Sequence, residues 1–236
     1  MVDVRALALD FGGTLARPGP RPDGAIVAEV LRGLAGTVVP DGFPAVFDAV
    51  GRRIRREDRA RGVQSLFAEQ LHRAARECGA VLPDLPGAIE ALFTAVPDAE
   101  VDPAAADALR RVRRDHGGLR CVLACDTQRP ESVRRRTLRA AGLADCFDAL
   151  VLSSTVGARK PHRRFYDAVV DAAGCRPQEI LFVGDTPAKD AIGPHAYGMR
   201  AVLVTPAARP DGLPQEIGVI GHFAELPGYL ARLLRS

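Results

Sequence analysis

Asp-Phe-Gly-Gly-Thr-Leu occupies residues 10–15 and directly follows the apolar run Ala-Leu-Ala-Leu at residues 6–9. A second loop of this kind, Gly-Asp-Thr-Pro-Ala-Lys-Asp at 184–190, follows the apolar run Ile-Leu-Phe-Val at 180–183. Short apolar runs of this length, bounded by glycine, are typical of strands that are buried in a parallel sheet. The carboxyl ends of such strands face one crevice, so acids about 175 residues apart in the sequence can share one metal ion and one phosphate.

The length and composition of the chain limit its fold and its partners. Its 236 residues can bury a full core, and they fit an α/β domain that carries an insertion. The net charge of +3 is too mild for a nucleic-acid-binding surface, and tryptophan is absent. Only two basic residues are lysines, Lys160 and Lys189, and both lie in the motifs described below. Of these, Lys189 is expected to be a solvated side chain.

Cysteine usage and hydropathy indicate the compartment. The five cysteines are scattered and lack the close pairs of a zinc site: Cys78, Cys121, Cys125, Cys146 and Cys175. No signal segment is recognisable, and no apolar run approaches the ~18 residues that a membrane span needs. We therefore expect a reduced, cytoplasmic chain that has no membrane partner.

Strands and helices alternate in the second half of the chain. Strands are predicted at 119–124, 150–153, 180–184 and 201–204, and helices at 131–141, at 163–173 and after Lys189. This alternation predicts an α/β fold with a Rossmann-like, doubly wound parallel sheet. The stretch between the first strand at 4–9 and the strand at 119–124 has apolar residues at helical spacing. We therefore expect residues 1–17 and 101–236 to form the core, and residues 18–100 to form an inserted, all-helical cap.

The order of the motifs resembles that of the haloacid dehalogenase superfamily. In that family the first loop reads Asp-x-Asp-x-Thr, the second strand ends in Ser or Thr, Lys-Pro follows, and a Gly-Asp-x-x-x-x-Asp loop closes the site. This chain has Asp10 with Gly13-Thr14, then Lys160-Pro161, then Gly184-Asp185 and Asp190. The resemblance covers residues 4–15 and 119–204, and it implies a Rossmann-like core with a variable cap and hydrolase chemistry.

The same resemblance implies a role for each motif residue. It makes Asp10 the nucleophile that attacks phosphorus, forming an aspartyl-phosphate that water then hydrolyses. The implied cofactor is Mg²⁺, held by Asp10, Asp185 and the backbone carbonyl of Gly12, while Asp190 acts from farther away or through water. Lys160 is the implied partner of Asp10 and of a phosphoryl oxygen. The implied phosphate contacts are Gly13, Thr14, Cys125, Thr127 and Lys160.

Gly12 departs from the pattern of the family's phosphatases. Their second acid stands at this position, where it protonates the leaving oxygen and later activates water. General acid–base help of this kind is typically worth ~10²–10⁴-fold in rate. Plain alkyl phosphates are therefore expected to be poor substrates, whereas acyl, enol and aryl phosphates have better leaving groups and suffer less.

A second departure is Cys125-Asp126-Thr127, which replaces the family's Ser or Thr followed by Asn. A thiol is a weak hydrogen-bond donor to phosphate, so Thr127 is expected to take over that contact. Asp126 has two possible roles at this stage. It either enters the crevice as a displaced acid or base, or it bonds to local backbone as a turn residue.

We predict a Mg²⁺-dependent phosphohydrolase that acts on a small phosphorylated metabolite. One alternative is a 2-haloacid dehalogenase, which uses an Asp nucleophile without the second acid and needs no metal. The other is a catalytically impaired protein that binds phosphate or a partner, a possibility that Gly12 and Cys125 keep open. The arginine-rich stretch at 52–61 is expected to be a solvated helix face, or else to grip an anionic substrate.

Overall fold

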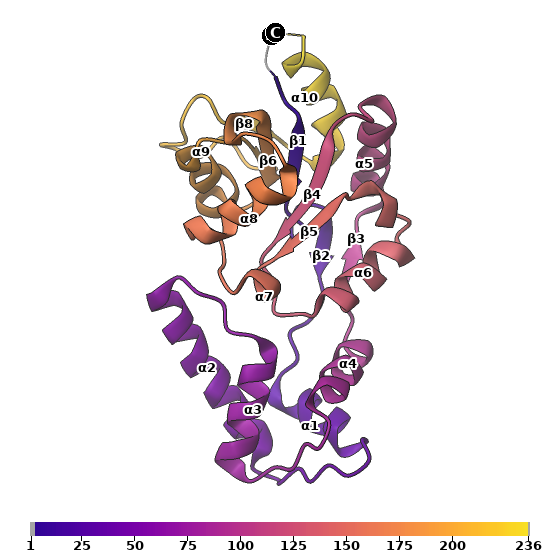
Figure 1. The fold of residues 1–236 in the computed structure, drawn as a ribbon, viewed down its shortest axis with the longest axis vertical. Coiled ribbons are helices and arrows are strands. Elements are labelled where there is room, and N and C mark those ends of the chain that lie inside the picture. Colours follow the sequence, from indigo (N-terminus) through magenta and orange to yellow (C-terminus); the bar gives the residue numbers. More distant parts are fainter. Residues whose placement is uncertain (1–2, 236) are drawn as a thin grey trace.

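A six-stranded parallel sheet forms the centre of the molecule. The computed structural model describes residues 3–235 and orders the strands β5-β4-β1-β6-β7-β8 (Figure 1). Their bounds are β1 (Ala6–Leu9), β4 (Arg120–Cys125), β5 (Ala149–Leu152), β6 (Ile180–Gly184), β7 (Arg200–Val204) and β8 (Gly218–Ile220). Leu9 of β1 pairs with Leu123 of β4 and with Val183 of β6. The loops that follow these three strands therefore leave the sheet at the same edge.

Both faces of the sheet are buried under helices. On one face, Leu7 and Leu9 pack in a cluster with residues of α5 (Pro103–Asp115) and α10 (Leu226–Leu233). On the other, Ala6 and Ala8 pack in a cluster with α8 (Arg163–Ala173). Since successive strand residues point to opposite faces, burial of both faces explains why β1 is apolar throughout instead of alternating. The predicted doubly wound α/β fold is confirmed.

The remaining core helices lie in the loops of the sheet. They are α6 (Glu131–Ala140) and α7 (Ser153–Val156), a π-helical turn at Pro187–Ile192, α9 (Gly193–Tyr197), and 3₁₀ turns at Ala144–Cys146, Pro177–Glu179 and Phe223–Glu225. The helix predicted after Lys189 thus begins earlier, as the turn that carries Lys189 itself. No helix within residues 3–235 combines the length and apolarity needed to cross a membrane.

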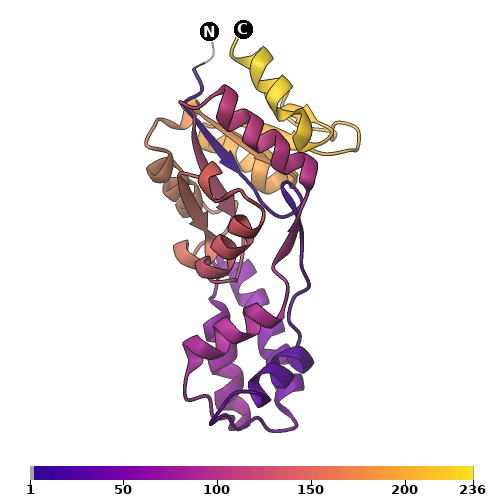
Figure 2. The same cartoon turned by 90° about the vertical axis from the view of Figure 1, so that its right-hand side faces the viewer.

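Between β1 and β4, the chain leaves the core and returns to it through a short antiparallel ribbon. The ribbon pairs β2 (Ala16–Pro18) with β3 (Ala99–Val101), two strands that were not predicted from the sequence. We call residues 19–98, which lie between these strands, the helical insert. It contains α1 (Gly24–Arg32), α2 (Phe43–Arg61), α3 (Phe67–Cys78) and α4 (Leu85–Ala95). Figure 2 shows the two connecting segments running side by side to the insert.

The helical insert has a hydrophobic core of its own. Phe43, Phe47, Phe67 and Phe93 follow one another through this core, with ring centroids 4.9–5.9 Å apart. One residue of the sheet-bearing part joins them: Val133 of α6, which is buried in the same cluster. Helix α6 therefore packs on the insert as well as on the sheet.

Candidate active site

Asp10 lies immediately after β1, at the edge where β1, β4 and β6 end. Its backbone N–H donates to the carbonyl of Val183 at 2.9 Å, which ties the loop to β6. Gly13 turns the chain back with φ +86°, a left-handed conformation that favours glycine. A Cβ at Gly13 would lie 2.2 Å from Oδ2 of Asp185, so the close approach of the two loops also excludes a side chain. The glycine in the first motif therefore allows the second acidic loop to reach Asp10.

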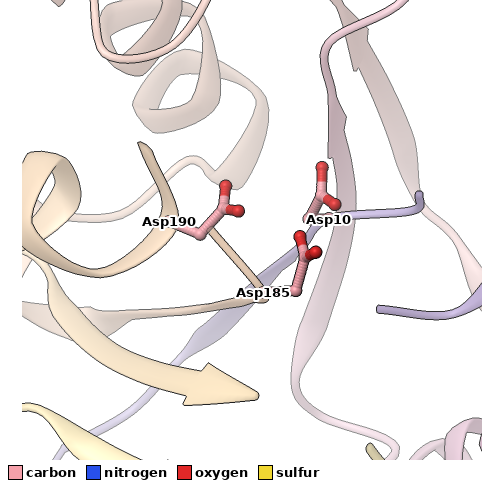
Figure 3. A group of neighbouring side chains, drawn as sticks. All are labelled: Asp10, Asp185 and Asp190. Atoms are coloured by element: carbon pink, nitrogen blue, oxygen red, sulfur yellow. The ribbon is translucent and has the colours of Figure 1, made fainter. Parts of the chain in front are cut away.

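Three carboxylates meet at this edge of the sheet. Asp10, Asp185 and Asp190 each offer one oxygen, and these oxygens lie within 4.8 Å of one another. Figure 3 shows the three side chains directed toward a common space, Asp10 from the end of β1 and the other two from the loop after β6. An all-oxygen donor set of this size suits a hard divalent cation such as Mg²⁺.

Lys160 is the cation at the centre of the acid cluster. Its Nζ donates to Oδ1 of Asp10 and to Oδ1 of Asp190, both at 2.6 Å, and to the carbonyl of Ala124 at 3.1 Å. The side chain is almost completely buried. Burial acts to lower the pKa of Lys160, but the charges of Asp10 and Asp190 outweigh it, so the pKa lies above the ordinary value. Lys160 is therefore a fixed positive charge.

Burial also raises the pKa of two acids in the cluster. It raises the pKa of Asp10 to about 6, against the opposing effect of Lys160, and Asp190 adds to the rise. The pKa of Asp185 is raised by burial and by the charge of Asp10. When all groups are ionised, three carboxylates share one ammonium, which leaves an excess of negative charge in a buried site. A divalent cation would remove that excess, so the charge as well as the donor type fits Mg²⁺.

Asp190 and Thr14 differ from the other motif residues in what they contact. Both oxygens of Asp190 are engaged, Oδ1 by Lys160 and Oδ2 by the backbone N–H of Thr186 at 2.9 Å. Asp190 is thus held where a water molecule could connect it to an ion bound by Asp10 and Asp185. The hydroxyl of Thr14 lies 3.5 Å from Oδ2 of Asp10, which is long for an O–H···O hydrogen bond.

The loop after β4 carries Cys125 and Thr127. Burial raises the pKa of the Cys125 thiol to about 12, so this group stays protonated and is a poor nucleophile. Thr127 is fixed by its backbone N–H, which donates to Oγ of Ser153 at 2.8 Å, and by its Oγ1, which accepts from the N–H of Arg129 at 3.0 Å. These bonds leave the hydroxyl hydrogen of Thr127 available to donate to a phosphate.

Asp126 joins the two lysines of the chain. Its Oδ1 accepts from the backbone N–H of Lys160 at 3.0 Å, and its Oδ2 accepts from Nζ of Lys189 at 3.1 Å. Nε of Arg159 lies 3.7 Å from Oδ2. Lys189, which was expected to be solvated and not catalytic, is partly exposed and also pairs with the carboxylate of Asp126 beside the acid cluster. No sequence pattern indicates this pair, because the partners are 63 residues apart.

A cavity of about 530 Å³ opens between the core and the helical insert. Asp10, Gly12 and Lys160 line its core side, and Phe47, Phe67 and Gln70 line its insert side. Arg129 and Arg134 also lie in the wall, although no sequence motif had pointed to either. Among the described arginines of the stretch at 52–61, Arg55 alone lines this cavity, together with the acid Asp58 of the same stretch. Four neighbouring arginines line a separate surface groove with Arg55 and Ala49: Arg52, Arg53, Arg56 and Arg59.

Comparison with known proteins relates these motifs to a family. A family model of haloacid dehalogenase-like hydrolases matches residues 4–198. A phosphoserine phosphatase from Thermus thermophilus is 38% identical over 90 residues, which are 38% of this chain and 36% of that protein. A phosphoglycolate phosphatase from Cereibacter sphaeroides is 34% identical over 137 residues, which are 57% of this chain and 59% of that protein. The matches thus span less than two thirds of either curated relative.

Solved structures extend the likeness to nearly the whole chain. A 2-haloacid dehalogenase from Pseudomonas syringae has a TM-score of 0.71 at 22% identity, covering 97% of this chain and 99% of that one. A HAD phosphatase from Thermococcus onnurineus has a TM-score of 0.56 at 22% identity, covering 96% and 98%. At this identity the structures show the fold and not the reaction. On the match of its family model across most of its length, the chain belongs to the haloacid dehalogenase-like hydrolases.

Proposed function

We propose that this hydrolase is a Mg²⁺-dependent phosphohydrolase that uses Asp10 as its nucleophile and acts on a small phosphorylated metabolite. The observation that carries the proposal is the acid cluster, in which oxygens of Asp10, Asp185 and Asp190 lie close together and the ammonium of Lys160 pairs with two of them, Asp10 and Asp190. A site with excess negative charge repels a phosphate unless a cation is added. This arrangement therefore makes chemical sense for phosphate when a divalent ion binds with it.

The residues of the site support two successive displacements at phosphorus. In the first, a carboxylate oxygen of Asp10 attacks phosphorus, the bond to the leaving oxygen breaks, and an aspartyl-phosphate forms. In the second, water attacks the same phosphorus and releases Asp10 and inorganic phosphate. Lys160 and Thr127 would hold phosphoryl oxygens during both steps.

Asp10, Asp185 and the carbonyl of Gly12 would hold the Mg²⁺ ion, with Asp190 acting through water. When bound, the ion would neutralise the charge that keeps a carboxylate and a phosphate apart. The phosphate contacts predicted for Gly13, Thr14 and Cys125 remain part of the proposal, as does that of Thr127. Its Oγ1 accepts from the N–H of Arg129, which leaves the hydroxyl hydrogen for a phosphate.

The size of the cavity and the relatives support a small substrate. About 530 Å³ accommodates a metabolite of modest size in addition to its phosphate. The two curated relatives described above are named for phosphoserine and phosphoglycolate, both of them small phosphorylated acids. With Gly12 in place of an acid, we expect acyl, enol and aryl phosphates to turn over faster than alkyl phosphates.

We assign to Asp126 the positioning of Lys160 and Lys189 in preference to proton transfer. Both of its oxygens already accept hydrogen bonds, and one of these comes from the backbone of the lysine that contacts Asp10. Asparagine at this position keeps an oxygen for the N–H of Lys160. Asp126→Asn is therefore expected to lower kcat less than tenfold and to leave the shape of the pH–rate profile unchanged. If one limb of that profile disappeared, Asp126 would be the missing acid or base.

The dehalogenase alternative is disfavoured by the acid cluster. Displacement of a halide needs no metal, so it gives no reason to gather three carboxylates around one buried lysine. The binding alternative is favoured only by Gly12 and Cys125. It does not explain why a nucleophile, its ammonium partner and a cation-type donor set are kept together.

The experiment that tests the proposal is phosphate release from acetyl phosphate, an aryl phosphate and a sugar phosphate, each measured with Mg²⁺ and with EDTA. We expect release that requires Mg²⁺ and falls at least about 10²-fold in Asp185→Asn, which removes one proposed ligand and keeps the side-chain volume. The matched control is Asp167→Asn, which changes an acid on α8 outside the cavity lining and should act like the native chain. Equal rates in Mg²⁺ and EDTA, or halide release from a 2-haloacid, would contradict the proposal.

A further inference from the structure

A single side chain, Arg129, holds both segments that connect the core to the helical insert. Its guanidinium donates to the carbonyl of Pro20 at 3.0 Å, on the outgoing segment. It also donates to the carbonyls of Val96 at 3.3 Å and Pro97 at 2.9 Å, on the returning segment. Only 9% of Arg129 is exposed, so water competes weakly for these bonds even though the residue lines the cavity. Any movement of the two segments must therefore be accompanied by Arg129 or break its bonds.

The backbone of the same residue belongs to the loop after β4 in the active site. Its N–H donates to Oγ1 of Thr127 at 3.0 Å, and its carbonyl accepts from Oγ of Ser154 at 2.9 Å. Thr127 lines the cavity and is one of the residues proposed to contact the phosphate. Arg129 thus links the connecting segments to Thr127, which is a proposed phosphate contact. Its side chain bonds to the segments, and its backbone N–H bonds to Thr127.

Asp98 of the returning segment extends this connection to a second buried arginine. Its Oδ1 lies 3.1 Å from Nε of Arg129, and its Oδ2 lies 3.2 Å from Nη1 of Arg134 on α6. Oδ2 also accepts a hydrogen bond from the hydroxyl of Thr137 at 2.7 Å. The guanidinium of Arg134 lies over the ring of Phe11, 3.7 Å from its centroid, directly beside the nucleophile. The returning segment is thereby connected to both catalytic loops.

Stability alone does not account for this arrangement. Two guanidinium groups share one carboxylate, and all three side chains are about nine-tenths buried or more. Among the residues that the structure describes, Nε of Arg134 is buried with no hydrogen-bond partner, and Oδ1 of Asp98 and Nη1 of Arg134 meet their ion-pair partners outside hydrogen-bond geometry. Buried ion pairs can often be replaced by apolar residues without loss of stability, and unpaired polar atoms add a cost. Such a cost is expected where a contact serves function.

We propose that Arg129 is a positioning residue, which transmits the position of the helical insert to Thr127. When the insert moves toward the cavity, the two connecting segments move with it, and Arg129 carries that displacement into the loop that places the hydroxyl of Thr127. The effect of Arg129 on catalysis rests on the proposed phosphohydrolase function. The connection between the insert and the loop does not rest on that function, so the connection and the catalytic effect can be tested separately.

Backbone amide exchange, followed by mass spectrometry on the full chain, tests the connection without any substrate. Arg129→Met removes the bonds to Pro20, Val96 and Pro97 but keeps a long side chain. We expect exchange to rise about tenfold in the connecting segments and also in the loop at 126–129, although the substitution leaves the backbone bonds of that loop in place. Unchanged exchange in the loop of a folded Arg129→Met variant would overturn the proposal.

The matched control is Arg136→Met. Arg136 lies on α6 and donates to the carbonyl of Phe93 in the insert at 3.3 Å, but within residues 3–235 it makes no hydrogen bond to the loop after β4. Its substitution should raise exchange near Phe93 and leave residues 126–129 unchanged; faster exchange in that loop here as well would contradict the specific role of Arg129. If Arg129→Met does not fold, Arg129→Lys replaces it, because a lysine keeps the charge beside Asp98 but lacks the planar fork that reaches both segments.

A double-mutant cycle tests the consequence for turnover. We expect Arg129→Met to lower kcat/KM by about 10²-fold in the native background, and to add little to the loss caused by Thr127→Val. Losses that multiply would show that Arg129 does not act through Thr127. If the native chain releases no phosphate from any substrate, the proposed function fails, while the exchange result still decides the connection.

Discussion

Replacing Gly12 by aspartate is expected to raise the turnover of alkyl phosphates by about 10²–10⁴-fold, because it restores a group that can protonate the leaving oxygen and then activate water. The change requires only a small shift of one neighbouring side chain. A Cβ at Gly12 meets only Cγ of Pro18, at 3.1 Å, and the backbone there is not in the left-handed region. Gly12 also lines the cavity, so a new carboxyl group has access to a bound substrate.

Gly12→Asn is the matched control for this prediction. It adds a side chain of nearly the same size that cannot transfer a proton, so it should leave turnover of alkyl phosphates unchanged or lower. The gain from aspartate should shrink for aryl and acyl phosphates, whose leaving groups need no protonation. Equal rates in the two variants would show that another group supplies the proton transfer that is missing at Gly12, or that proton transfer does not limit the rate of turnover.

Asp10→Asn should abolish metal-dependent phosphate release, with a loss of at least about 10³-fold, because an amide oxygen is a very weak nucleophile toward phosphorus. The fold should survive, since Lys160 keeps its bonds to Asp190 and to the carbonyl of Ala124. Thermal unfolding of the variant checks this point. A large loss of activity in an unfolded variant would be uninformative about chemistry, so the two measurements belong together.

Trapping the proposed covalent intermediate provides a second, independent check on Asp10. Acid quenching of the native enzyme during turnover of an aryl phosphate should trap a phosphoryl group on the peptide that contains residues 10–15. The same peptide from Asp10→Asn should carry none. A phosphoryl group on a different peptide, or undiminished turnover in Asp10→Asn, would assign the nucleophile elsewhere.

The sheet was predictable where its strands are buried on both faces. In β1 and β6 every residue is buried, so continuous apolar runs identified both strands, and the register places their ends side by side. The shorter strands β2, β3 and β8 were missed. Each has three residues, and β2 includes Pro18, so their pairing depends on neighbours in space instead of on a local pattern.

The acid cluster was predictable because each acid follows a strand within a recognisable loop. The contacts that hold this cluster were not. Asp126 pairs with Lys189 across 63 residues, and Arg129 reaches Pro20 across 109 residues, at positions with no motif spacing between them. Residues in the acidic motifs could therefore be predicted from the sequence more readily than the residues that position them. The positioning contacts depend on how loops from separate strands meet in space.

The central position of β1 in the sheet bears on the order in which the molecule folds. Its partners β4 and β6 lie about 110 and about 170 residues farther along the chain, so its pairing must close two long loops. The helices of the insert pack mostly on near neighbours in sequence, such as α2 on α3, and need no such closure. We therefore expect the insert to be structured early in folding, while Asp10 remains without a catalytic environment until β6 and its acidic loop have docked.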